Sequence, residues 1–148
     1  MKNLVIIFLF APYFIFSQSE EKKDAILSYL KSEGYTANVT DAGNIKFKFE
    51  GDNYYVNGGD DELYFEIFDY ISNSNEGCSN RIKQIVAETD ASYKTLNVYF
   101  TSDDDCAVIK FSVSSLLANK EDFKFIFKRS LNILKYGQKK MGDLYSEK

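Results

Sequence analysis

Residues 41–56 have the sequence DAGNIKFKFEGDNYYV, in which a strand pattern lies between two turn-rich clusters. Within it, Ile45, Phe47 and Phe49 alternate with two lysines, which is the pattern of a strand with one buried face and one wet face. Clusters of Asp, Asn, Glu and Gly border this strand on both sides, as expected for tight turns. The stretch therefore predicts neighbouring antiparallel strands whose apolar side chains point to one side.

The same two-residue period recurs along the chain. Residues 63–71 alternate in this way, and so does the hairpin LNVYFTSDDDCAVIKFSV at residues 96–113. Residues 35–40 and 54–57 are shorter candidate strands. Together these segments predict five to six strands, most of them joined to their neighbours by hairpins.

Three segments show the helical period instead, residues 20–33, 79–89 and 119–141. Gly34 supplies a stop for the first helix and Asn119 a cap for the last. Strands linked by hairpins with separate helices predict an α+β fold. We expect an antiparallel sheet of five to six strands packed with three helices, in the order α-β-β-β-α-β-β-α.

The first seventeen residues have the pattern of a secretory signal peptide. Lys2 precedes an unbroken apolar run from Leu4 to Phe16, which is shorter than the ~20 residues that span a bilayer. Cleavage is expected after Ser17 or Ser19. The product would be exported to the periplasm or the medium, without membrane insertion. The alternative is a buried N-terminal helix.

Residues 18–148 contain no linker, repeat or low-complexity stretch, so we expect them to form a single domain. The absence of His excludes Ser-His-Asp and Cys-His catalysis and removes the commonest transition-metal ligand. Neither a phosphate-binding glycine loop nor a nucleophile elbow is present. The net charge of −4 argues against a nucleic-acid partner. We therefore expect no catalytic residues, no metal and no cofactor.

Cys78 and Cys106 are the two cysteines of the chain. A pair of cysteines in an oxidising compartment favours a disulfide. Two unpaired thiols are the main alternative. A redox centre is a weaker one, because the C-x-x-C spacing is absent.

Two acidic clusters, residues 60–62 and 103–105, allow another interpretation. Converging carboxylates could bind Ca²⁺, or could act as the acid and base of a hydrolase. Neither cluster fits the EF-hand pattern, and consecutive Asp side chains on a strand cannot all point one way. Solvated turns are the preferred interpretation.

Aromatic residues make up 16% of the chain. Tyr64, Phe68 and Tyr99 fall on predicted strands in the phase opposite to the expected core. If they share an outer sheet face, they form an amphipathic patch of the kind used in protein contacts. The alternative is ordinary cross-strand packing beneath a helix.

The chain resembles the YbjN-like family, also called bacterial sensory transduction regulators, which share a type III secretion chaperone-like fold. Four segments carry the resemblance: the helix ending at Gly34, residues 41–56, residues 96–113 and the helix from Asn119. The resemblance implies an α/β sandwich that binds protein surfaces, often as a homodimer, and it supplies no catalytic residues. The Phe- and Ile-rich leader followed by Ser-Gln is similar to those of exported Bacteroidetes proteins.

The sequence thus predicts a non-enzymatic, chaperone- or adaptor-like exported domain. Such a domain would bind a protein or peptide partner through its sheet face or a sheet edge. The alternative function is a carboxylate-based hydrolase or a calcium-dependent binding module that uses the acidic turns.

Overall fold

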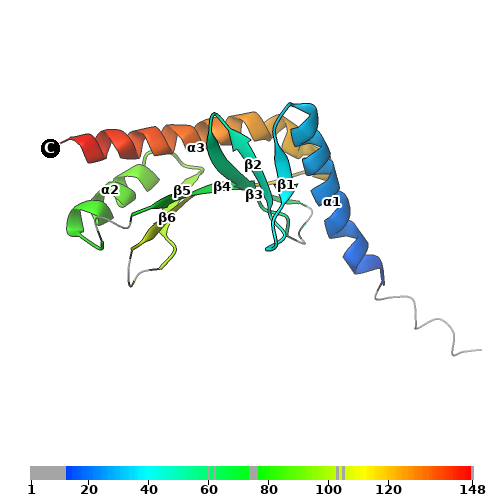
Figure 1. Ribbon diagram of the computed structural model, residues 1–148, viewed down its shortest axis with the longest axis horizontal. Coiled ribbons are helices and arrows are strands. Elements are labelled where there is room, and N and C mark those ends of the chain that lie inside the picture. Colours follow the sequence, from blue (N-terminus) through cyan, green and yellow to red (C-terminus); the bar gives the residue numbers. More distant parts are fainter. Residues whose placement is uncertain are drawn as a thin grey trace, which may run out of the picture.

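Six antiparallel strands form one sheet, and three helices lie on one of its faces (Figure 1). The predicted α+β class and element order are confirmed, with four strands before the second helix. The computed structural model describes residues 13–59, 61, 63–73, 77–102, 104 and 106–147. The elements are α1 (Tyr13–Ser32), β1 (Ala37–Val39), β2 (Ile45–Phe49), β3 (Asp52–Val56), β4 (Tyr64–Ser72), α2 (Asn80–Asp90), β5 (Leu96–Phe100), β6 (Val108–Leu116), the 3₁₀ turn η2 (Lys120–Asp122) and α3 (Phe123–Ser146).

The centre of the sheet is the pair formed by β4 and β6. The strand order is β1-β2-β3-β4-β6-β5. β4 pairs with β6 along its whole length, from Tyr64 opposite Leu116 to Ser72 opposite Val108. β3 meets β4 at two residue pairs only, so the β1–β3 part joins the central pair over a short contact.

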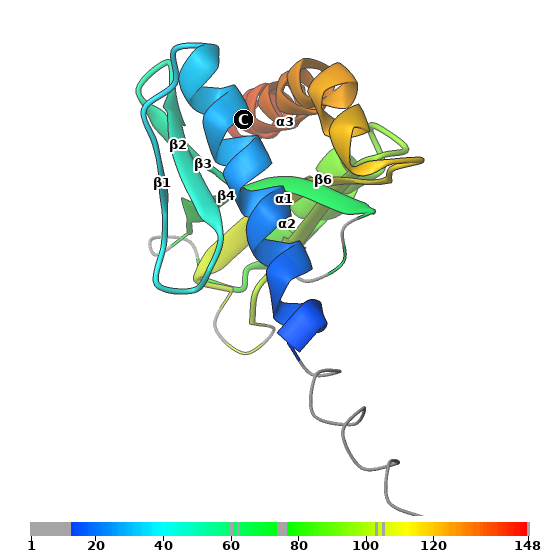
Figure 2. The same ribbon diagram turned by 90° about the vertical axis from the view of Figure 1, so that its right-hand side faces the viewer.

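One face of the sheet carries the core. α1 packs on β1 and β2, α3 packs on β4 and β6, and α2 covers β5 (Figures 1 and 2). Alternation places every second strand residue on this face, where it meets the apolar stripes of the helices. The fully buried large side chains are Tyr54, Phe47, Phe65, Phe111, Phe123, Phe127, Ile26, Leu30, Ile45, Ile67, Ile82 and Ile109.

α1 begins earlier than the sequence predicts. It starts at Tyr13 and not at Glu20, because no helix-breaking residue lies between Tyr13 and the stop at Gly34. Its first residues belong to the predicted signal peptide, whose residues 1–12 lie outside the described part of the chain. None of the helices in the described part is long and apolar enough to cross a membrane.

α3 ends later than predicted, at Ser146 and not near Met141. Leu144 continues the apolar stripe past Met141 and packs against the core, and Arg81 of α2 binds the end of the helix. Arg81 Nη2 donates to the carbonyl oxygens of Tyr145 (2.7 Å) and Glu147 (3.1 Å). Carbonyls at the end of a helix lack partners within it, and this guanidinium supplies one.

Side-chain caps begin α2 and the 3₁₀ turn before α3, where Asn119 caps η2 and not the last helix itself as predicted. The Ser79 side chain accepts from the backbone N–H of Ile82 at the start of α2. Asn119 caps η2, where its side chain and that of Asp122 form a reciprocal capping box that leads directly into α3.

A buried lysine fastens α1 to the sheet, which the sequence pattern did not reveal. Lys22 is 2% exposed, and its Nζ donates to the carbonyl oxygens of Asp61 (2.6 Å) and Tyr64 (2.5 Å). Hydrogen bonds offset the cost of burying the ammonium group. The contact sets the position of the turn before β4 relative to α1.

Gly137 on α3 allows close packing against β5, and we expect Gly137→Ala to destabilise the protein. A Cβ at this position would lie 2.6 Å from Cδ2 of Leu96, a buried side chain with little room to move. The clash should cost about 1–3 kcal/mol, more than the ~1 kcal/mol that alanine gains in a helix. Urea denaturation measures the difference.

Gly142→Ala is the matched control on the same helix, because no atom lies within 4 Å of its added Cβ. This variant should be more stable than wild type by roughly 0.5–1 kcal/mol. Equal stabilisation by both substitutions would contradict the close contact at Gly137.

Candidate binding surface

The sheet surface opposite the helices is the candidate site, and we call it the outer face. Within the described part of the chain, all three helices lie on the other side of the sheet (Figures 1 and 2). The strand registers determine which side chains reach this face. They include Asn38, Lys46, Lys48, Asn53, Tyr55, Tyr64, Glu66, Phe68, Tyr70, Asn97, Tyr99, Lys110, Ser112, Ser114 and Leu116.

Phe68 occupies the middle of the outer face. Its ring stacks on Tyr55 at 5.5 Å between centroids and meets Tyr70 edge-on at 5.5 Å. Lys110 Nζ lies 4.4 Å from the centroid of the Phe68 ring, within the range of a cation–π contact. These neighbours leave Phe68 only 4% exposed, although no helix covers it.

An ion pair lies beside this aromatic cluster. Lys110 Nζ is 2.9 Å from Glu66 Oε1, and the two side chains are only 14% and 11% exposed. Burial by itself would lower the pKa of Lys110, but the hydrogen bond and charge of Glu66 outweigh it and raise the pKa. Lys110 therefore keeps its charge in a partly dehydrated setting, where its contact with Glu66 is stronger than it would be in water.

The structure places the three predicted surface residues, Tyr64, Phe68 and Tyr99, on the outer face together. Tyr99 is 44% exposed and Tyr64 is partly buried, while Phe68 forms the floor beneath Tyr55 and Tyr70. Strand phase was the correct signal for the face, but it does not report how far neighbouring side chains fold over a ring.

Sequence reasoning missed Lys110 and its part in this surface. The register places Tyr70, Lys110 and Tyr99 in one row across β4, β6 and β5. Pairing the predicted hairpin residue by residue would have located Lys110 opposite Tyr99. Its second neighbour, Glu66, is 44 positions away and depends on the β4–β6 pairing.

The two edges of the sheet offer little backbone for an added strand. On β5, the N–H of Val98 donates to Asp90 Oδ1 (2.7 Å) and the N–H of Leu96 donates to the Tyr93 carbonyl (3.1 Å). β1 has three residues. Occupied donors and short edge strands both hinder strand addition.

The helix-covered face contains one buried carboxyl group that the apolar pattern did not predict. Asp69 accepts from Gln138 Nε2 at 2.7 Å, and Gln138 Oε1 accepts from the Tyr54 hydroxyl at 3.1 Å. Burial raises the pKa of Asp69 to about 6, although hydrogen bonds from the Tyr70 backbone and Gln138 oppose the rise. Burial also raises the pKa of Tyr54 to about 12.

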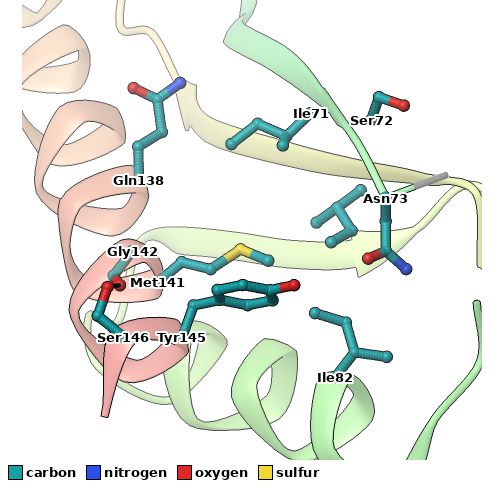
Figure 3. A pocket seen from close by; sticks show the side chains of 10 residues that line it. Ile71, Ser72, Asn73, Ile82, Gln138, Met141, Gly142, Tyr145 and Ser146 are labelled. Atoms are coloured by element: carbon teal, nitrogen blue, oxygen red, sulfur yellow. Dashed lines mark hydrogen bonds between the residues drawn. The ribbon is translucent and has the colours of Figure 1, made fainter. Parts of the chain in front are cut away.

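A cavity of about 380 Å³ opens beside Gln138 at the end of the core. In Figure 3, Met141 and Tyr145 extend from α3 into the space between Ile71 of β4 and Ile82 of α2, and Gln138 lies one turn earlier on the same helix. The polar groups on its wall are uncharged amides and hydroxyls, so the cavity by itself offers no acid, base or metal-binding set.

Cys78 and Cys106 are joined by a disulfide close to this cavity. The neighbouring Asn73 donates from Nδ2 to the carbonyls of Cys106 (2.9 Å) and Gly77 (3.0 Å). The bridge and these hydrogen bonds fasten the end of β4 and the start of α2 to the β5–β6 connection.

The acidic clusters are only partly described. Asp60, Glu62, Asp103 and Asp105 lie outside the described residues. The Asp61 carboxylate accepts from the backbone N–H groups of residues 63 and 64, as in an Asx turn. In the described ranges, no group of three or more Cys, Asp or Glu is arranged to hold a metal ion.

Comparison with known proteins finds a solved structure of similar fold. No family model matches the chain. No curated protein matches it by sequence. The structure of YbjN from E. coli, described as a candidate transcription regulator, superposes with a TM-score of 0.58 over 78% of this chain and 87% of that one. The sequence identity is 12%, so the likeness shows a YbjN-like fold and no more.

Phe68 and Tyr99 should differ in their contribution to stability. Phe68→Ala removes a buried ring, so it should lower the free energy of unfolding by about 3 kcal/mol. Tyr99→Ala removes a half-exposed ring and should cost less than about 1 kcal/mol. Urea titrations of both variants give the two values. Similar losses in both would mean that the outer face is packed throughout.

Asp69 should make stability depend on pH. Its folded-state pKa of about 6 lies above the ordinary 3.8, so the folded chain holds a proton that the unfolded chain releases. Stability should therefore fall as pH rises from about 4 through 6, by up to ~1.4 kcal/mol per pH unit. Asp69→Asn should abolish this slope in urea titrations. Parallel curves for both proteins would contradict the assignment.

Proposed function

We propose that this chain is a non-enzymatic binding domain that contacts a protein or peptide partner through the outer face of its sheet. The observation that carries the proposal is the row of Tyr70, Lys110 and Tyr99 next to Phe68 and Tyr55. Tyrosines at a helix-free surface combine apolar area with a hydroxyl that can hydrogen-bond, and they are typical of protein interfaces.

Contacts among its partly buried side chains hold this surface rigid before a partner binds. Tyr55, Phe68 and Lys110 hold one another in place, while Tyr70 and Tyr99 each remain 44% exposed. A binding surface that is already ordered loses less side-chain entropy when a partner docks. The occupied β5 edge and the short β1 edge further support binding on the face.

Other functions receive less support from the described residues. The Asp61 carboxylate is engaged by backbone N–H groups, which disfavours a role as a catalytic base or a calcium ligand. The E. coli protein of similar fold is described as a candidate transcription regulator. At 12% identity we transfer the fold from it and not the activity.

We place the binding domain outside the cytoplasm. The leader pattern of residues 1–17 supports export, and a disulfide between Cys78 and Cys106 accords with an oxidising compartment. A chaperone- or adaptor-like role in the periplasm or medium follows, with a second copy of the chain as one candidate partner.

The test compares two pairs of tyrosines with similar exposure. Tyr70→Ser/Tyr99→Ser alters the outer face, where both rings are 44% exposed. Tyr93→Ser/Tyr136→Ser alters the helix side, where the rings are 42% and 48% exposed. Immobilised protein is incubated with periplasmic extract and culture medium, and stoichiometric partners are identified by mass spectrometry.

The outer-face variant should retain at least about tenfold less of the partner, because interface tyrosines each contribute on the order of 1–2 kcal/mol. The helix-side variant should behave like wild type. Equal retention by both variants would exclude the outer face as the binding surface.

A mass measurement without reductant checks in the same samples that the chain begins after Ser17 or Ser19.

A further inference from the structure

We infer that the partner's contact segment is acidic and that its carboxylates bind at a hollow at the β1–β3 end of the outer face. The hollow has a volume of about 210 Å³ and is lined by Thr36, Asn38, Lys46, Phe47, Lys48 and Asn53. This inference rests on the proposed function, since it names the chemistry of the partner that the same face would bind.

Two lysines line the hollow without acidic partners. Lys46 and Lys48 are two positions apart on β2, so both ammonium groups project from the same face. Neither lysine forms an ion pair within the described residues, as is also true of Lys31, Lys83, Lys94, Lys139 and Lys140, but these two alone are neighbours on the outer face. Their charges are therefore available to a ligand.

Asn53 provides a second, independent sign of a missing ligand. It lies opposite Lys48 in the β2–β3 register, and its Oδ1 is buried with no hydrogen-bond partner in the structure. A buried acceptor without a donor is destabilising by roughly 1–3 kcal/mol, so a rotation of the Asn53 side chain that brought Oδ1 to a donor on a bound molecule would be favourable. The hollow thus offers two cations and one vacant acceptor.

An acidic peptide meets both requirements. Its side-chain carboxylates would pair with the ammonium groups, and its backbone N–H groups would donate to Asn53 Oδ1 once that side chain turns toward the hollow. An inorganic anion would satisfy the lysines alone. A nucleic acid is disfavoured, because the net charge of the chain is −4.

The charge distribution favours the same partner. The strand residues of the outer face include three lysines (Lys46, Lys48, Lys110) and one glutamate, Glu66. The face is therefore positive although the chain as a whole is negative. An acidic segment would be attracted to this face, which helps to orient it during association.

The hollow is continuous with the aromatic cluster. Lys46 Nζ lies 5.9 Å from the centroid of Tyr55, whose ring stacks on Phe68. Neighbouring strands are ~4.8 Å apart, so the distance from β2 to β5 is about 19 Å, or about six residues of extended chain. A segment of that length can place carboxylates at the lysines and apolar groups on the tyrosines.

The test uses the mature protein and a fluorescein-labelled peptide of twelve residues that alternates Glu and Ser. A Gln/Ser peptide of the same length is the matched neutral probe, and anisotropy is read at low ionic strength. The variants are Lys46→Gln/Lys48→Gln and, as a control with the same change of charge, Lys83→Gln/Lys94→Gln. Both control lysines are exposed and lie outside the outer face.

The acidic peptide should bind wild type at least about tenfold more tightly than the neutral peptide, and salt should weaken it. Lys46→Gln/Lys48→Gln should reduce this affinity about tenfold, and the control less than about twofold. Asn53→Asp, a near-isosteric change that places a carboxylate in the hollow, should also weaken binding. Equal affinity for both peptides, equal losses in both double variants, or no binding at about 1 mM peptide would overturn the inference.

The proposed function has a separate readout. If Tyr70→Ser/Tyr99→Ser still abolishes capture of a partner that Lys46→Gln/Lys48→Gln retains fully, the face binds a partner but the acidic chemistry is wrong. Analytical sedimentation of the protein alone tests whether a second copy of the chain binds to the outer face. A dimer that the lysine substitutions dissociate would identify a second copy, and would also overturn the inference.

Discussion

The register between β4 and β6 is the constraint on which both faces of the sheet depend. It alternates Phe65, Ile67 and Ile71 toward the helices with Glu66 and Phe68 toward the outer face. A slip of one residue would exchange the two sets. It would then place the Glu66 carboxylate in the core, where an unpaired charge is strongly unfavourable. The apolar core and the charged outer face therefore select the same pairing.

Asp69 is the exception to this alternation, and its surroundings explain how it is tolerated. It faces the helices between Ile67 and Ile71, where the pattern calls for an apolar side chain. Gln138 of α3 donates to it and also accepts from Tyr54, so the polar atoms form one connected set. The core also closes incompletely here, since Gln138 and Ile71 line the cavity. The polar side chain that interrupts the apolar alternation of β4 thus lies where the core packing is incomplete, at the end of the domain that the disulfide holds together.

Much of the fold could be predicted because its signals are local. The two-residue period of Ile45, Phe47 and Phe49 and the cap at Asn119 report structure within a few residues of themselves. The helix ends were less predictable, because the end of α3 past Met141 is bound by Arg81, a residue of another element.

The candidate site shows the same division between local and distant information. Strand phase assigned Tyr64, Phe68 and Tyr99 to one face, since phase is local. The burial of Phe68 depends on Tyr55, Tyr70 and Lys110, which come from three strands. The vacant acceptor on Asn53 depends on the absence of a donor in three dimensions, which no sequence period encodes.

The ion pair between Lys110 and Glu66 lies on a face without helices, so its effect on stability can be weighed against its effect on the neighbouring rings. A partly buried ion pair contributes little net stability, because desolvation offsets most of the attraction, and apolar residues of similar volume often serve the fold as well. What the pair adds is a fixed position for the lysine ammonium group. It keeps a cation beside the rings of Phe68 and Tyr99, 4.4 Å and 5.9 Å from their centroids. A partner that covered this row would remove the remaining water and strengthen those electrostatic contacts. If the outer face binds a partner as proposed, the pair contributes more to that binding than to folding.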